Sequence, residues 1–299
     1  MSTPTILGQK SDADEVCAAD ARAERAVAQR YLHRVPWEMV AWGLGNCLVW
    51  LLLWPLVLSG LLPLWLGFLL STLCAILAYL PSHEAQHSII GAEGTRLRWL
   101  NELVGHVSLL PIAFPYRLAW ITHRQHHAHV NHPDLDPDIS NRGETWWQSV
   151  YSALRARQPG KNHAYARIMR ESDHPKRDQA MLEAFALQVL YFGVLTLAAW
   201  TGHAIEACVL WWLPRHLGII YIQLFLSWAP HYPMAETGRY RDTRIWTCRF
   251  GTIVSMGMEY HLIHHLYPRI PLFDTPKAFR EMEGLLLAGG VRDERSASR

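Results

Sequence analysis

Four long apolar stretches divide the chain, and the charged residues gather between them. Residues 39–58 and 60–80 are separated only by a short turn, and residues 184–202 and 207–230 form a second pair. An α-helix rises 1.5 Å per residue, so each stretch is about 30 Å long, the thickness of the hydrocarbon core of a bilayer. The pattern predicts four membrane-spanning helices arranged as two hairpins, in an all-α protein.

The segments outside these stretches are polar or interrupted. Residues 1–36 lack an apolar core, so we expect no signal peptide there but a flexible start followed by a short amphipathic helix. Residues 100–122 are apolar but carry charged residues and prolines, which favours a place at the membrane interface. A Thr-Pro pair at position 275 predicts the start of a last helix. The expected parts are a cytosolic N-terminal segment (1–36), a membrane domain (37–275) and a C-terminal cap helix with its tail (276–299).

The positive charges give this arrangement an orientation. Of the 28 Lys and Arg residues, 5 lie in residues 1–36, 12 in 82–181 and 10 in 231–299. Four spans place these three segments on one side, which the positive-inside rule makes the cytoplasm. We therefore expect a multi-pass protein with both termini cytosolic, in a bacterial inner membrane. The net charge of +2 is too small to indicate a nucleic acid partner.

Arg215 is the one remaining positive charge, and it interrupts the fourth stretch. A guanidinium is costly at this depth of a bilayer. It either snorkels to the outer interface or faces a polar cavity, and the sequence leaves both open.

The candidate chemistry lies in the histidines. The five cysteines are far apart and form no CxxC pair, so they support neither a disulfide framework nor a zinc ribbon or iron–sulfur site. The 17 histidines, in contrast, include three clusters. These are His83-Glu-Ala-Gln-His87, His123-Arg-Gln-His126-His127 and His261-Leu-Ile-His264-His265.

The spacing of the clusters indicates a metal site. Positions three and four residues apart share one face of a helix, whereas adjacent histidines diverge by about 100° and can serve two metals. A chain of this composition would contain an HxxHH about 0.05 times by chance, yet two occur here. His231 ends the fourth stretch at the same predicted membrane face. Nine imidazoles exceed the four ligands of a tetrahedral zinc ion and suit two first-row transition metals, iron among them.

Other interpretations of these residues stay open. His83 to His87 also match the HExxH signature of zinc proteases, with Glu84 as general base, but the other two clusters would then be unexplained. A metal-binding membrane protein without catalytic activity is a further alternative. If the chain is not a protease, Glu84 either orients a ligand imidazole or is solvated. Asp134, Asp136 and Asp138 either hydrogen-bond the outer nitrogens of ligand histidines or form a surface turn.

Taken in order along residues 37–275, these motifs resemble the integral-membrane fatty-acid desaturase superfamily, the histidine-box di-iron enzymes. The resemblance implies a helical membrane protein with a cytosolic cap that holds two iron ions. The ligands it implies are His83, His87, His123, His126, His127, His231, His261, His264 and His265. Ser227 stands where characterised acyl-CoA desaturases carry an Asn linked to iron through water, so the chain departs from the pattern there.

Two branches of the superfamily are similar to this chain in the motifs around the second and third clusters. Desaturase-type β-carotene hydroxylases are similar to this chain in the segments His123–Asp138, Pro230–Pro233 and Tyr260–Pro268. Many bacterial acyl desaturases are similar in these segments too and share the ending HHLYP. Both imply that O₂ and two electrons oxidise an unactivated C–H bond of a lipid that enters from the bilayer. We expect fatty-acyl desaturation, with carotenoid ring hydroxylation as the alternative. The electrons are expected from an external ferredoxin, rubredoxin or cytochrome b5-type donor. The basic cap either docks this donor or only reflects the positive-inside rule.

Overall fold

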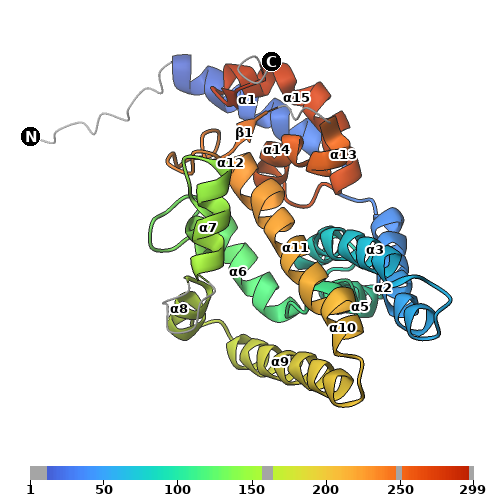
Figure 1. The fold of residues 1–299 in the computed structure, drawn as a ribbon. Helices are drawn as coiled ribbons and strands as arrows, with labels where there is room; N and C mark the ends of the chain where they lie inside the picture. Colours follow the sequence, from blue (N-terminus) through green and yellow to red (C-terminus); the bar gives the residue numbers. More distant parts are fainter. Residues whose placement is uncertain (1–11, 157–163, 247–250, 296–299) are drawn as a thin grey trace, which may run out of the picture.

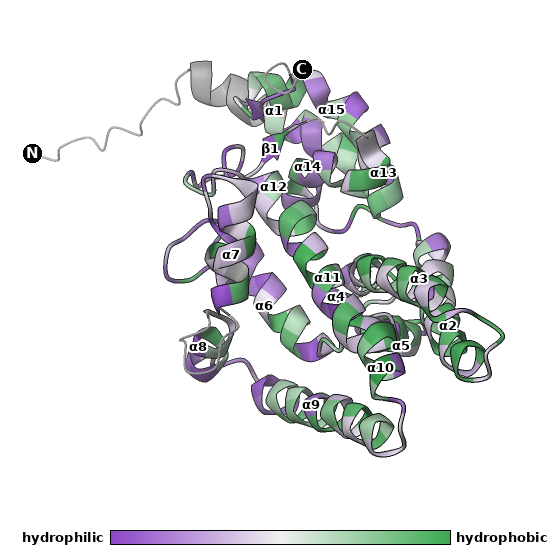
Figure 2. Ribbon diagram, viewed as in Figure 1, coloured by the Kyte–Doolittle hydropathy of each residue, from purple (hydrophilic) through white to green (hydrophobic). Residues whose placement is uncertain are grey.

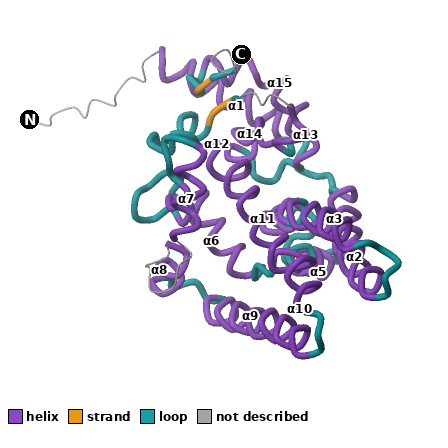
Figure 3. Tube along the Cα trace, in the orientation of Figure 1, coloured by secondary structure: helices purple, strands orange, loops and turns teal. Residues whose placement is uncertain are grey.

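The computed structural model describes residues 12–156, 164–246 and 251–295 (Figure 1). Within these ranges nearly every element is helical (Figure 3). The strands are two short ones, β1 (Arg244–Ile245) and β2 (Arg292–Asp293), which pair in parallel. The expected all-α fold is confirmed.

The first helical hairpin contains α2 (Trp37–Leu58), α3 (Leu64–Ile76) and α4 (Tyr79–Gln86). Its turn includes Gly60, whose φ of +74° is a left-handed conformation that glycine adopts without steric cost. The second span was expected at 60–80, but the helical segment runs from Leu64 to Gln86. Pro63 lies in extended backbone and starts the helix later. The polar residues of α4 are buried against neighbouring helices, so the helix continues beyond the apolar run.

The second hairpin begins with α9 (Arg177–Trp200), seven residues before the predicted start at 184. Among the added residues, Glu183 pairs with Arg117 at 2.7 Å. The turn contains Gly202, with a φ of +86°. The returning helix runs without a break from Ala204 to His231. Its parts are α10 (Ala204–Ala207), the π-helix η3 (Cys208–Trp212), α11 (Leu213–Ile222), the π-helix η4 (Gln223–Trp228) and α12 (Ala229–His231).

The four predicted spans therefore exist as helices long and apolar enough to cross a membrane, with shifted ends. Figure 2 shows hydrophobic residues dominating α2, α3, α9 and α11. The shifted ends bring acidic residues such as Glu84 and Glu183 into the helices, whereas the expected spans contained none. Most side chains of α9 are exposed, as expected for a helix whose surroundings are lipid.

The segment between the hairpins forms short helices. They are α5 (Arg98–Val107), the 3₁₀ turn η1 (Leu110–Ile112), α6 (Tyr116–Ala128), the 3₁₀ turn η2 (Pro137–Asn141), α7 (Trp146–Ala156) and α8 (Ala164–Glu171). The expected interfacial region 100–122 corresponds to α5, η1 and the first half of α6, none of which is long enough to span a membrane. Buried residues of this region, including Val104, Ile112 and Tyr116, form one apolar core with the first hairpin.

The N- and C-terminal regions pack together at one end of the molecule (Figure 1). The helices are α1 (Asp12–Gln29), α13 (Gly251–Ser255), the 3₁₀ turn η5 (Met258–Tyr260), α14 (His261–Leu266), the 3₁₀ turn η6 (Leu272–Asp274) and α15 (Thr275–Ala288). The predicted helices at the two ends are both present, although the predicted flexible start lies outside the described residues. The hydroxyl of Tyr31 donates to Glu281 at 2.7 Å and joins the turn after α1 to α15. This cap covers α14, which carries the third histidine cluster.

Candidate metal centre

The clustered histidines lie on four helical segments. His83 and His87 stand at the C-terminal end of α4, and His231 ends α12. The second cluster occupies the last turns of α6, and the third forms most of α14. Although these segments are far apart in the sequence, their imidazoles meet in two groups that could each hold a metal ion.

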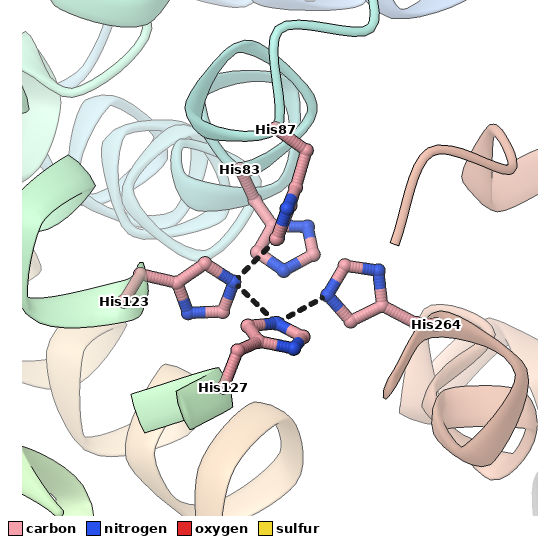
Figure 4. A group of neighbouring side chains, drawn as sticks. All are labelled: His83, His87, His123, His127 and His264. Carbon is pink, nitrogen blue, oxygen red and sulfur yellow. Dashed lines mark hydrogen bonds between the residues drawn. The ribbon is translucent and has the colours of Figure 1, made fainter. Parts of the chain in front are cut away.

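Five imidazoles from α4, α6 and α14 form the first group (Figure 4). One nitrogen of each lies within 4.8 Å of the others; the residues are His83, His87, His123, His127 and His264. Nε2 of His123 lies 2.8 Å from Nε2 of His87 and 3.1 Å from Nε2 of His127. Nε2 of His127 lies 3.0 Å from that of His264. Figure 4 shows the rings gathered around a common centre, which is how imidazoles surround a bound metal.

Four imidazoles form the second group, again with nitrogens within 4.8 Å of one another; they are His126, His231, His261 and His265. Nε2 of His261 and Nε2 of His265 are 3.0 Å apart. The ring centroids of His231 and His265 are 4.7 Å apart. This group takes its members from α6, α12 and α14, so it shares two helices with the first.

The doubled histidines divide between the two groups. His126 and His127 fall in different groups, and so do His264 and His265, as their divergence around a helix predicts. The rings of His127 and His265 stack with 4.2 Å between their centroids, so the two groups lie side by side. The arrangement is a pair of adjacent nitrogen-rich sites.

A buried carboxylate orients one imidazole of the four-histidine group. Nδ1 of His126 donates to Oδ1 of Asp136 at 2.9 Å. Asp136 is fully buried and also accepts from the backbone amides of Asn131 and Asp138. The carboxylate fixes the tautomer of His126, so that Nε2 presents its lone pair to the centre of the group.

A backbone carbonyl group orients His231 in the same way. Its Nδ1 donates to the carbonyl oxygen of Asp242 at 3.0 Å. Its Nε2 atom is buried and has no hydrogen-bond partner among the described residues. A buried, unpartnered nitrogen is costly unless something binds it, and a neutral imidazole is a common ligand of metal ions.

Burial and the surrounding imidazoles lower the pKa of His87, His123 and His127 well below the usual value of histidine. They are therefore neutral, the form that binds metal ions. His126 is the exception: burial lowers its pKa, but the Asp136 carboxylate outweighs burial and raises it to about 9. The imidazole nitrogens of each group lie within 4.8 Å of one another, which fits transition-metal ions, whose bonds to imidazole are about 2 Å long. At His126, a metal ion bound to Nε2 would displace the proton from that nitrogen.

The three aspartates after the second cluster differ in what they do. Only Asp136 contacts a clustered histidine in the described part of the chain. Asp134 is exposed, as the surface-turn alternative predicts. The carboxylate of Asp138 accepts from the Tyr165 hydroxyl at 2.6 Å and from the Ser227 hydroxyl at 3.0 Å.

If the chain is not a protease, the sequence allows two roles for Glu84, orienting a ligand imidazole or being solvated. Glu84 takes neither. It is 2% exposed, so it is not solvated, and its Oε1 atom accepts a hydrogen bond from the backbone amide of Leu272 at 2.7 Å. The contact joins α4 to η6 across 188 positions. Glu84 therefore holds the first cluster against the cap rather than orienting an imidazole directly.

A cavity of about 410 Å³ adjoins the histidines. His83, His123, His126 and His261 line part of it, and most of the remaining wall is apolar, with residues from α4, η1, α6, α8, α9, α11 and η4. A cavity of this size suits a small-molecule or lipid ligand.

Sequence reasoning missed several polar residues of this wall, and two of them contact the candidate residues named above. Tyr165 contacts Asp138, and Asn141 donates from Nδ2 to the Ser227 hydroxyl at 2.9 Å. Both lie outside any motif, and the one available signal is the proximity of Asn141 to the second cluster in the sequence.

Comparison with known proteins identifies the family. The family model described as fatty acid desaturase matches residues 48–295. Over 255 residues the chain is 22% identical to the sn-1 oleoyl-lipid 12-desaturase of a Picosynechococcus strain, covering 75% of this chain and 69% of the relative. It is 24% identical to the sn-1 acyl-lipid omega-3 desaturase (ferredoxin) of a Nostoc strain, covering 67% of this chain and 62% of the relative.

A plant protein with a desaturase name is also similar to this chain. The chain is 22% identical to the chloroplastic sn-2 acyl-lipid omega-3 desaturase (ferredoxin) of Arabidopsis thaliana, over 60% of this chain and 47% of the relative. The chain thus spans between about half and about two thirds of the length of these relatives. Because the family model covers most of the chain and the apolar helices match a membrane protein, we conclude that the chain belongs to the fatty acid desaturase family.

Proposed function

We propose that this protein introduces a double bond into an acyl chain of a membrane lipid. In the balanced reaction, two hydrogen atoms leave adjacent carbons, and O₂ takes them up with two electrons and two protons to give two molecules of water. The observation that carries the proposal is the pair of histidine groups beside a largely apolar cavity. The names of the relatives support an acyl lipid as the substrate class.

The nine clustered histidines are the proposed ligands of two iron ions, five for one and four for the other. Iron bound there would supply the activation of O₂ needed to break an unactivated C–H bond. The chain's own residues hold the nitrogen donors in place. Asp136 keeps His126 in one tautomer, and the apolar wall of the cavity excludes water and holds the acyl chain beside the histidines.

The electrons come from a separate protein in this proposal. Two of the relatives carry ferredoxin in their names, so we propose a ferredoxin as the donor. Rubredoxin and cytochrome b5-type proteins are the competing donors, and reconstitution with each purified donor in turn distinguishes them.

We propose that both termini and the histidine groups face the cytoplasm of a bacterial cell. The distribution of Lys and Arg supports this orientation. Leu61 lies in the first hairpin turn with 77% of its surface exposed, whereas Lys277 lies on α15 at the opposite end. In a background without native cysteines, Leu61→Cys should react with an impermeant thiol reagent in intact cells and Lys277→Cys should not. The reverse pattern contradicts the orientation.

The function is tested by expressing the chain with a ferredoxin and its reductase and profiling acyl lipids and pigments. New double bonds in acyl chains are expected, and they should disappear in His126→Ala. His33→Ala is the matched control, because His33 is exposed and outside both groups. Hydroxylated carotenoid rings without new acyl double bonds would assign the alternative reaction. If neither product forms in cells that contain the folded protein, both reactions are contradicted.

A further inference from the structure

A buried carboxylate on the N-terminal helix belongs to no motif of the sequence. Glu24 of α1, at the capped end of the molecule (Figure 1), is 1% exposed, although carboxylates are rarely buried unless they are paired. Its Oε1 atom accepts from the Tyr267 hydroxyl at 2.6 Å and from the Arg239 guanidinium at 2.7 Å, and its Oε2 atom accepts from the Tyr240 hydroxyl at 2.7 Å. The guanidinium of Arg239 also lies 5.4 Å and 5.5 Å from the centres of the two tyrosine rings. We refer to these four residues as the Glu24 cluster.

One member of the Glu24 cluster directly follows the third histidine cluster. Tyr267 is two residues beyond His265, at the end of α14. Its hydroxyl donates to Glu24 and accepts from Nη2 of Arg239 at 3.2 Å, so it is held from two sides. Because α14 is only six residues long and has few hydrogen bonds of its own, this contact fixes the end of a helix that carries two members of the four-histidine group.

Two other members, Arg239 and Tyr240, belong to the turn that orients His231. This turn is closed by the backbone amide of Asp242, which donates to the carbonyl oxygen of Gly238 at 3.0 Å. The carbonyl oxygen of Asp242 in turn accepts from Nδ1 of His231 at 3.0 Å. By holding two side chains of the turn, the carboxylate on α1 therefore fixes the carbonyl group that keeps His231 in place.

The two histidine groups depend on the Glu24 cluster to different extents. Three of the four members of the four-histidine group stand on segments that the cluster holds; they are His231, His261 and His265. Of the five described imidazoles in the other group, His264 alone stands on such a segment, and the rest lie on α4 and α6. The position of α1 thus affects the four-histidine group more than its neighbour.

We propose that Glu24 is a positioning residue for the four-histidine group, so that the docking of α1 and the binding of a metal ion there stabilise each other. This inference rests on the metal binding in the proposed function but not on the reaction. The effect is reciprocal by linkage, because a contact that improves a binding site is itself strengthened when the site is filled. The carbonyl oxygen of Asp242 also accepts from Asn131 at 2.9 Å, so loss of Glu24 weakens the site without abolishing it.

Cobalt binding tests the inference without iron or turnover. The purified full-length chain, freed of metal in detergent, is titrated with Co²⁺, and its visible absorption is followed. His127→Ala impairs the five-histidine group and His126→Ala the four-histidine group, so the tighter Co²⁺ ion in each background reports the intact group. Glu24→Leu should weaken this ion by about fivefold or more in the His127→Ala background, the lower end of the usual coupling between linked sites, and by less than twofold in the other. Glu24→Gln keeps an acceptor oxygen and should restore part of the affinity.

Glu281→Leu is the matched control. Glu281 accepts from the Tyr31 hydroxyl at 2.7 Å and pairs with Arg30 at 2.6 Å, so it joins the residues after α1 to α15 rather than to a segment that carries clustered histidines. This variant should leave Co²⁺ binding unchanged in both backgrounds. If Glu24→Leu does not fold, Tyr267→Phe, which removes a single hydroxyl, takes its place and should weaken the same ion.

Proteolysis measures the reciprocal effect. Arg22 and Arg25 are exposed on α1 on either side of Glu24, and trypsin cleaves a helix there only when it opens locally. Co²⁺ should slow this cleavage in the His127→Ala background, and Glu24→Leu should remove the protection.

Three results would overturn the inference: unchanged Co²⁺ affinity when Glu24→Leu is added to the His127→Ala background, equal weakening in both backgrounds, or no Co²⁺ binding by the unmodified chain. The acyl-lipid profile is measured separately. A chain that shows the selective weakening but makes no double bonds contradicts the proposed reaction and leaves the role of Glu24 standing.

Discussion

The two histidine groups are held in place by different means. In the five-histidine group, the hydrogen-bond contacts found among the described residues are between the imidazoles themselves, His87, His123, His127 and His264. In the four-histidine group, the Asp136 carboxylate and a backbone carbonyl bind the outer nitrogens of two imidazoles. The first group thus depends on packing among ligands, and the second depends on residues that are not themselves candidate ligands. Variants can therefore affect the two groups separately.

The largest effect is expected from removing one imidazole from either group. His126→Ala should lower bound iron from about two to about one ion per chain and reduce desaturation by roughly 100-fold or more, because a metal site loses a ligand. His127→Ala should do the same at the other group. Iron analysis and product yield measure both effects, with His33→Ala as control. Full iron content with normal turnover in His126→Ala would remove this residue from the site.

A smaller and more selective effect is expected from Asp136→Asn. The change removes the charge that orients His126, and outer-shell changes of this kind weaken metal binding by about 10- to 100-fold. Competition with a chelator should show one weakened and one unchanged iron. Asp134→Asn is the matched control because Asp134 is exposed. Equal weakening of both irons would contradict the difference between the two groups.

Glu84 provides a third test, of stability rather than chemistry. Glu84→Ala removes the acceptor for the Leu272 amide, and a buried unpaired amide costs about 1–3 kcal/mol. The unfolding temperature should fall, whereas iron content and much of the activity remain. Glu84→Gln keeps an acceptor oxygen and should be closer to wild type. Loss of all activity in both variants, with full stability, would instead support a general base in the HExxH sense.

The smallest effect is expected at the cavity wall. Ser227→Ala removes two hydrogen bonds, the one donated to Asp138 and the one accepted from Asn141, a loss of about 2 kcal/mol. Iron content of both groups should stay the same, and product yield should fall by less than tenfold. A loss of iron from either group in this variant would mean that the wall and the metal site are one unit.

The sequence predicts the framework of the site well because its signals are local. The spacing of four residues places His123 with His127, and His261 with His265, as predicted. The pairs three residues apart, His123 with His126 and His261 with His264, divide between the groups instead. The doubled histidines indicate two sites. Apolar length gives the four long helices, although their ends shift where polar residues such as Glu84 and Glu183 are buried or paired.

Contacts between distant segments could not be predicted in this way. The partner of Glu84 is a backbone amide 188 positions away, which no pattern in the chain encodes. Asp134, Asp136 and Asp138 look equivalent in the sequence, and only the path of the turn decides that Asp136 contacts His126. The hydrogen bonds that Asp138 accepts from Tyr165 and Ser227 likewise depend on packing between α8, η2 and η4.

The most direct test of the central claim is metal analysis of the purified, active chain, combined with Mössbauer spectroscopy. We predict about two iron ions per chain in two nitrogen-rich environments, one of which is lost in His126→Ala and the other in His127→Ala. A single zinc ion per chain in the active protein, or iron content that neither substitution changes, would contradict the account.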